Sequence, residues 1–357
     1  MAYTTIDDPS AHFQIALWTG NGSSGTAITN DGNSDLQPDW IWGKIRVDNA
    51  DQLKNHWWID SSRGINKALG SNTTSSEETN SGYLNSFDSD GFTLGNDGNS
   101  NGSGDTVVGW QWKANGGTTA SNSSGTNITS TVQANTTAGF SIVTFTGTGN
   151  DGDSYGHGLT SAPELVIPKK RSGTSNWQGY AFDGGNSQYF YLNLTNAFAS
   201  TSGNSAASSS SVITTDGSGD SNPSGGTVVS YCFHSVQGYS KIGRYTGNGN
   251  ADGPFVYLGF KPAWVMVKRT NTTGAWEIYD SARNGNDSNP INDRLRANDN
   301  AAENADDTSD YVSDFLSNGW KIRTNSGNWN TSGHTYIYMA FAESPFVSSE
   351  GVPTTAR

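Results

Sequence analysis

The chain repeats one ordered set of sequence features three times, and this repetition constrains its fold more than any other feature. Each copy begins with an apolar run that ends in Thr-Gly-x-Gly. A Pro and a second apolar run ending in Lys follow, then an aromatic run closed by Asp, and finally a β-rich stretch. The landmarks of the three copies are Thr19, Thr146 and Thr246, then Pro38, Pro163 and Pro262, then Asp60, Asp183 and Asp280. Four features in one order, three times over, indicate internal duplication.

The length of the repeat indicates how the copies are organised. Each unit has roughly 100 residues, which exceeds the roughly 20–50 residues of solenoid repeats and matches the usual size of a domain. We therefore expect three tandem domains, each of which buries a core of its own. The expected divisions are an N-terminal arm over 1–12, repeats over 13–113, 139–238 and 239–346, a Ser/Thr/Asn/Gly-rich linker over 114–138 and a C-terminal tail over 347–357. The alternative for the linker is that residues 131–133 begin the first strand of the next domain.

The residue types predict an all-β fold. Val, Ile, Tyr, Phe, Trp and Thr make up the apolar segments, and Asn-Gly and Asp-Gly pairs separate them. Apolar residues at helical spacing are almost absent, and the one helical candidate spans 301–316. Many short strands with Gly-rich turns predict β-sandwich domains. Strands such as 140–145 and 336–341 are apolar on both faces, so we expect a neighbouring sheet, domain or subunit to cover them twice.

Charge and targeting signals exclude several classes of protein. The net charge of −13 opposes broad contact with nucleic acid. No run approaches the roughly 20 apolar residues of a membrane span, and residues 1–8 lack the basic and apolar segments of a secretory signal. The lone Cys232 lies in an apolar strand and is expected to be a buried core residue. The sequence thus predicts a protein made in a reducing cytoplasm without disulfide bonds.

Several segments resemble repeat modules in virion-associated proteins of tailed phages, especially marine ones. The segments that carry the resemblance span 3–10, 87–94, 138–143, 252–257 and 336–343. The resemblance covers nearly the whole chain. It implies concanavalin-like or jelly-roll-like β-sandwich domains in a phage structural protein, either a tail fibre or a capsid-surface fibre.

Catalytic residues do not stand out in the sequence. There is no Gly-x-Ser-x-Gly motif, and no two His residues have the spacing of a zinc site on a helix. Carboxylate pairs for glycosidic cleavage could come from Asp60 with Asp88 or from Asp280 with Asp310. However, an Asp that recurs at one landmark in every copy favours a structural hydrogen-bonding role. We therefore expect a protein that is not an enzyme.

Acidic turns raise the question of a metal. The turns at 88–91, 96–99, 150–153 and 216–220 offer the oxygen ligands that calcium prefers. Asx-turns account for the same residues without a cation, and the acidic positions do not recur from copy to copy. We expect no cofactor and no metal, with bound calcium as the alternative.

The Trp residues are the most informative candidates for binding. Seven of the twelve lie in the first repeat, and Trp40 with Trp42 and Trp110 with Trp112 form same-face pairs on strands. We expect these pairs to build the core or an interface. The alternative is that one pair faces outward and stacks on a sugar ring.

Together these features predict a non-enzymatic virion structural protein that serves host-surface attachment, with other virion proteins and a host glycan as partners. The alternatives are a capsid decoration or head-fibre protein, and a polysaccharide-binding or polysaccharide-degrading enzyme. We expect a homo-oligomer, most simply a trimer, because the doubly apolar strands and the Trp-rich first repeat exceed what small separate domains need. The N-terminal arm should become ordered only on another protein, and the third repeat should point outward.

Overall fold

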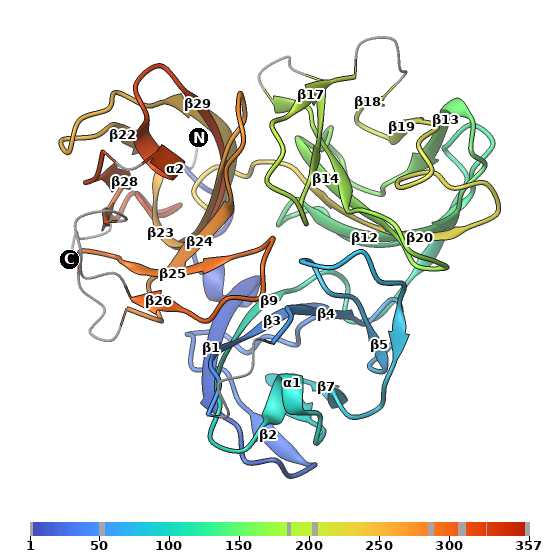
Figure 1. Cartoon of the computed structure of the whole chain (residues 1–357), viewed down its shortest axis with the longest axis horizontal. Coiled ribbons are helices and arrows are strands. Elements are labelled where there is room, and N and C mark those ends of the chain that lie inside the picture. The colour runs from blue at the N-terminus through green and yellow to red at the C-terminus, as the bar shows by residue number, and fades with distance from the viewer. Residues whose placement is uncertain are drawn as a thin grey trace.

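The structure is a computed structural model that describes residues 3–49, 54–183, 187–201, 206–284, 289–305, 312–325 and 327–353. Its regular elements are almost all strands, so the all-β prediction is confirmed. Three single-turn helices complete the described elements: η1 (Pro9–Ala11), α1 (Gly98–Asn101) and α2 (Gly327–Asn330). Figure 1 shows three lobes, one for each repeat, arranged around a common centre.

Each lobe has an inner sheet that contains four equivalent strands in one order. In the first repeat they are β1 (Phe13–Thr19), β9 (Thr106–Trp112), β3 (Trp40–Val47) and β4 (Trp57–Asp60). In the second they are β12 (Phe140–Thr146), β20 (Thr227–Phe233), β14 (Leu165–Lys170) and β15 (Gln178–Ala181). In the third they are β21 (Ser240–Thr246), β29 (Thr335–Pro345), β23 (Phe260–Arg269) and β24 (Trp276–Asp280).

The second and third inner sheets are extended at their edges. The second carries β10 (Ala120–Asn122) and β11 (Ser130–Asn135) beside β12, and β16 (Gln188–Tyr191) and β17 (Ala199–Ser200) beside β15. The third carries β25 (Asp293–Arg296) and β26 (Asn304–Ala305) beside β24. In the first repeat the corresponding region forms a separate hairpin of β5 (Lys67–Ala68) and β6 (Glu78–Thr79).

A three-stranded outer sheet covers each inner sheet on the side away from the centre. The outer sheets are β2 (Thr26–Ile28), β8 (Gly91–Leu94) and β7 (Leu84–Asp88); β13 (Asp151–Gly156), β19 (Val212–Asp216) and β18 (Ala207–Ser208); and β22 (Phe255–Tyr257), β28 (Gly319–Ile322) and β27 (Ser313–Leu316). All strand pairs in both kinds of sheet are antiparallel.

Alternate residues of each inner strand enter two different cores. On β3, Ile41 and Ile45 pack under the outer sheet of their own lobe, whereas Trp40 and Trp42 point to the centre of the molecule. The strands that were apolar on both faces are therefore covered twice, as expected. One cover is the outer sheet, and the other is the neighbouring lobes.

The central core is shared by all three repeats. Trp40 and Trp42 of the first repeat, Tyr231 of the second and Trp264 of the third belong to one cluster. The ring centroid of Trp40 lies 4.8 Å from that of Tyr231, and Trp42 lies 6.3 Å from Trp264. Each repeat therefore has a core of its own beneath its outer sheet, as expected, and the inner face of each lobe adds to a second, central core that the three repeats share. The residues that suggested an oligomer are buried within one chain.

Two expectations about connecting segments are wrong. The segment 114–138 is not a free linker, because it contributes β10 and β11 to the second inner sheet, and its Ser/Thr-rich strand finds partners on both sides. The described part of the N-terminal arm is also ordered within the chain. Ile6 is buried in the central core, and the Thr4 hydroxyl donates to the carbonyl of Gln237 at 2.9 Å.

The helical candidate at 301–316 is not helical where it is described. Its ends form β26 and β27, and residues 306–311 lie outside the described part of the chain. The predicted core role of Cys232 is confirmed, since it is fully buried under the second outer sheet and burial raises the pKa of its thiol to about 12.

The Thr and Pro landmarks occupy equivalent places. Thr19, Thr146 and Thr246 end the first inner strand of each lobe, opposite Thr106, Thr227 and Thr335. The second Gly of each motif has φ near +70° (Gly22 at 70°, Gly149 at 79°, Gly249 at 68°), a conformation that explains why Gly recurs there. Pro38 and Pro163 precede a strand, whereas Pro262 lies within β23 at a change of register.

We expect Trp40→Ala to destabilise the whole chain by about 3–5 kcal/mol, since Trp40 is fully buried where the lobes meet. Because the core is shared, urea unfolding followed by circular dichroism should remain a single transition at a lower midpoint. Val352→Ala, at a side chain that is 63% exposed, is the control and should change little. Two separate transitions in Trp40→Ala would contradict the shared core.

Candidate functional site

The Trp pairs considered for binding are not accessible to a ligand. Trp40, Trp42, Trp110 and Trp112 have no exposed surface, and all four belong to the central core. Trp40 stacks on Trp112 with ring centroids 4.2 Å apart. The alternative of an outward-facing sugar platform is therefore wrong for these residues.

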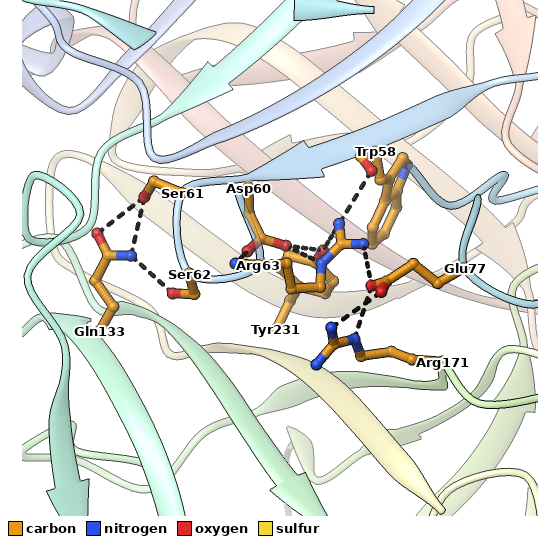
Figure 2. A network of polar contacts seen from close by, with 9 residues as sticks. All are labelled: Trp58, Asp60, Ser61, Ser62, Arg63, Glu77, Gln133, Arg171 and Tyr231. Atoms are coloured by element: carbon orange, nitrogen blue, oxygen red, sulfur yellow. Dashed lines mark hydrogen bonds and ion pairs between the residues drawn. The ribbon is translucent and has the colours of Figure 1, made fainter. Parts of the chain in front are cut away.

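Two of the repeated Asp residues form a buried ion pair within their own repeat and also accept a hydrogen bond from the neighbouring lobe. Asp60 accepts hydrogen bonds from the Arg63 backbone N–H at 2.9 Å and from Arg63 Nε at 2.5 Å, and both side chains are fully buried. The Tyr231 hydroxyl of the second repeat donates to the same carboxylate at 2.7 Å (Figure 2). Burial alone would lower the pKa of Arg63, but Asp60, Tyr231 and Glu77 raise it above its ordinary value.

A second carboxylate extends this network to a cation of the next repeat. Glu77 accepts from Arg63 at 3.1 Å and from Arg171 of the second repeat at 2.7 Å, as Figure 2 shows. Burial would raise the pKa of Glu77, but the hydrogen bond from Arg171 and the charge of Arg63 lower it. The network therefore connects the first lobe to the second through fully paired charges.

The interface between the third and first repeats has the same arrangement. Asp280 accepts from Arg283 Nε at 2.6 Å and from Trp110 Nε1 of the first repeat at 2.9 Å. Glu303 accepts from Arg283 at 2.7 Å and from Arg46 of the first repeat at 2.6 Å. Trp110 and Tyr231 occupy the same position in their inner sheets, so the two interfaces are equivalent.

Asp183 does not occupy the position of Asp60 and Asp280, so its alignment with them in the sequence is wrong. Asp60 lies opposite Trp40 and Asp280 opposite Trp264, but the residue opposite Leu165 is Ala181. Asp183 lies two residues further along and binds Arg244 of the third repeat, at 2.6 Å from Nε and 3.0 Å from Nη2. The second and third lobes are thus also joined by an ion pair, but of a different construction.

The Lys that ends the second apolar run is buried in every repeat. Lys44, Lys169 and Lys268 lie at equivalent positions, opposite Val108, Val229 and Ile337. Lys169 Nζ donates to the carbonyls of Ser175 at 2.6 Å and Thr74 at 3.3 Å. Burial lowers the pKa of Lys44 and Lys169 to about 8 and that of Lys268 to about 7. Lys169 and Lys268 each donate across an interface, to the carbonyls of Thr74 and Thr195, whereas Lys44 donates to the carbonyl of the adjacent Ile45.

Each repeat also has a buried Asn that is not among the sequence landmarks. Asn101, Asn222 and Asn330 have no exposed surface, and each accepts from the backbone N–H that follows the first Gly of the Thr-Gly motif, at 2.9, 2.9 and 2.7 Å. Their amide nitrogens donate to nearby loop oxygens. The signal was a Gly three residues earlier in every copy, at positions 98, 219 and 327.

The carboxylates that could have served chemistry have structural partners. Asp153 accepts from Thr148 at 2.5 Å and Asn127 at 2.7 Å, and Asp88 accepts from Ser86 at 2.5 Å and Thr93 at 2.7 Å. Asp310 lies outside the described residues. Within the described ranges, no group of three or more His, Cys, Asp or Glu could hold a metal ion.

An exposed aromatic pair lies on the outer sheet of the third repeat. Phe255 and Tyr257 are 45% and 49% exposed, whereas Val256 between them is buried under the sheet. Because side chains alternate along a strand, both rings are on the solvent face of β22, an edge strand. Lys241 Nζ lies 5.4 Å from the ring centroid of Tyr257, and the Tyr3 hydroxyl is 3.1 Å from the Tyr257 hydroxyl.

A groove of about 530 Å³ lies between the first and third repeats. Strand β1 forms one wall with residues 13–17, and the segment 29–32 forms another. The third repeat contributes Ala263, Ser281, Ala282, Ala342 and Glu343. The groove therefore combines a strand edge with small and acidic side chains.

Comparison with known proteins gives a family but no activity. A family model described as a domain of unknown function (DUF7483) matches residues 8–345. No curated protein and no solved structure matches the chain. Among the described helices, none has the length and apolar character needed to cross a membrane.

Removing one carboxylate of the buried network should be costly. We expect Asp280→Ala to lower the free energy of unfolding by about 3–5 kcal/mol, because Arg283 keeps its buried charge but loses its closest partner. Asp314→Ala, which breaks the pair with the exposed Arg323, should cost about 0–1 kcal/mol in the same urea titration. Equal effects of the two substitutions would contradict a structural role for Asp280.

The buried Lys residues predict a stability that increases with pH. Their folded-state pKa values are about 7 to 8, below the ordinary value of 10.5, so the unfolded chain binds more protons between about pH 7 and pH 10. The free energy of unfolding should therefore rise from pH 7 to pH 9. Urea midpoints at the two pH values test this, and Lys268→Met should reduce the increase. A lower midpoint at pH 9 would refute the assignment.

Proposed function

The chain belongs to the family described as a domain of unknown function (DUF7483), and we propose that it is a non-enzymatic structural protein of a tailed-phage virion that contributes to host-surface attachment. The observation that carries the proposal is the pair Phe255 and Tyr257, two half-exposed rings on the same face of β22. Within the proposal, the inner and outer sheets of each repeat make a β-sandwich of the concanavalin or jelly-roll type.

The aromatic pair has the properties of a sugar-stacking surface. Two rings at i and i+2 of one strand present a flat apolar area, and the hydroxyl of Tyr257 and the ammonium of Lys241 supply polar groups beside it. The Tyr257 ring is held by its contacts with Tyr3 and Lys241, so little conformational freedom is lost on binding. The corresponding edge strands β2 and β13 carry no comparable pair of exposed rings.

The use of the carboxylates supports binding over hydrolysis. Asp60, the candidate partner of Asp88, and Asp280, the candidate partner of Asp310, are fully buried in ion pairs with Arg63 and Arg283. Glu343 lines the groove between the first and third repeats but pairs with Lys261 at 2.5 Å. Glycoside hydrolysis needs two carboxyl groups that face one sugar, whereas attachment needs only a rigid surface.

The buried networks support a structural role. They join all three lobes through ion pairs that cross each interface, namely Arg171–Glu77, Arg244–Asp183 and Arg46–Glu303. A body of this kind can present a receptor-binding face at a fixed orientation, as an attachment protein requires. Assembly with other virion proteins, or as a trimer, is part of the proposal.

Binding to an array of bacterial surface polysaccharides tests the proposal. We expect the purified chain to bind at least one glycan, and Phe255→Ala with Tyr257→Ala to weaken that binding about tenfold or more, since each stacked ring contributes on the order of 0.5–1.5 kcal/mol. Val47→Ala, at a 55% exposed side chain elsewhere, is the matched control and should bind normally. Undiminished binding by the double variant would contradict the assignment of the site.

A further inference from the structure

The three interfaces between lobes differ in what lies beside the first inner strand. At the first interface, β11 pairs antiparallel with β12 and fills the space between the lobes. Gln133 of β11 donates from Nε2 to the hydroxyls of Ser61 at 3.0 Å and Ser62 at 2.7 Å in the first repeat (Figure 2). On the other side Gly158 lies against Val132, so closely that a Cβ there would lie 2.5 Å from a Val132 methyl carbon.

At the second interface an ion pair takes the corresponding place. Arg244 on β21 occupies the position of Thr144 on β12, and Asp183 occupies the position of Ser62. Their bidentate pair spans the gap that β11 fills at the first interface. A charged pair beside a sheet edge also opposes the addition of another strand.

At the third interface the described residues provide neither an added strand nor an ion pair beside the first inner strand. Leu17, which is 40% exposed, lies at the position that Thr144 and Arg244 occupy in the other two lobes. Ala282 lies at the position that Ser62 and Asp183 occupy there. Among the described residues β1 has a strand partner on one side only, namely β9. The groove of about 530 Å³ lies here, bounded by β1, by residues 29–32 and by Ser281 and Ala282.

The walls of this groove match the surroundings of β11 one by one. Strand β1 corresponds to β12, Ser281 and Ala282 correspond to Ser61 and Ser62, and residues 29–32 follow β2 as Gly158 follows β13. The first inner sheet therefore has the same site for an added strand as the second, but without the strand.

We propose that the groove between the first and third repeats binds an extended segment of a partner protein, which pairs antiparallel with β1 as β11 pairs with β12. Free N–H and C=O groups of an edge strand provide affinity in this mode, and the flanking walls select side chains. The segment carries small and β-branched residues, with a Gln or another amide opposite Ile15 to reach Ser281, since Gln133 lies opposite Ile142.

Charge argues for a partner chain that is neutral or basic. Asp31 lines the groove together with Glu343, whose charge is paired with Lys261, and no Lys or Arg lines it among the described residues. A second copy of this chain carries a net charge of −13, and its own β11 is held in place by Gln133 and by Asn135, whose amide donates to the Lys113 carbonyl at 3.1 Å. The rings proposed to bind a glycan lie on β22, outside this groove, so strand binding does not depend on glycan binding.

A peptide with the sequence of residues 128–137 is the probe, because it is uncharged and contains β11. Fluorescence anisotropy of the labelled peptide with the full chain should show saturable binding. The same peptide with Val132→Pro should bind at least about tenfold more weakly, because Pro lacks the N–H that a strand donates. Protection of the β1 amides in hydrogen exchange should accompany binding of the first peptide.

The variant Leu17→Arg with Ala282→Asp transfers the Arg244–Asp183 pair into the groove. It should remain folded, as thermal unfolding will show, and it should bind the peptide at least about tenfold more weakly. Val47→Arg with Val352→Asp places the same charges on exposed sites elsewhere and is the matched control. Equal binding by both variants, or no binding of the peptide to the native chain, would overturn the proposal. Concentration-dependent self-association that the peptide reverses would overturn it in favour of a second copy.

Discussion

A sheet that is apolar on both faces has to be covered twice, and the rest of this structure depends on how that requirement is met. The outer sheet of each repeat provides one cover from local sequence. The second cover can come only from the other two repeats, so the three inner sheets meet in one core. The first repeat contributes four Trp residues to that centre, whereas the equivalent positions hold Leu, Ile, Tyr and Phe in the second repeat and Trp, two Met and Phe in the third. Unequal side-chain sizes from the three repeats thus add up to a filled interior.

This closure forces charged groups into the interfaces. Where two lobes meet at their edges, Arg63 and Arg283 lose contact with water and need paired carboxylates to remain charged. The carboxylates in turn bind groups on the next lobe, so packing and ion pairing specify the same arrangement. A wrong relative rotation of two lobes would leave several buried charges unpaired, which is a strong penalty against alternatives.

The sequence predicted those features that depend on short stretches of chain. The strands, the Thr-Gly turns and the burial of Cys232 follow from alternation and from Gly at positive φ. The direction in which Trp40 and Trp42 point could not be predicted, because a strand that is apolar on both faces has no pattern to distinguish its two sides. The same ambiguity hid Phe255 and Tyr257, whose exposure depends on the position of β22 at a sheet edge. Asp183 was misassigned because it also closes an aromatic run, although strand pairing places Ala181, two residues earlier, at the position of Asp60 and Asp280.

One consequence of the arrangement concerns the order in which it is made. Peptide segments join the first lobe to the second and the second to the third, but the third meets the first only through contacts such as Arg46 with Glu303, 257 residues apart in sequence. Loop-closure entropy makes contacts of such separation slow to form. We therefore expect the contacts between the third and first lobes to form late in folding, and until they form, part of the Trp-rich inner face of the first lobe is exposed to water. The N-terminal arm adds to this junction, because the Tyr3 hydroxyl donates to the Gly259 carbonyl of the third repeat at 2.9 Å and Ile6 lies in the central core.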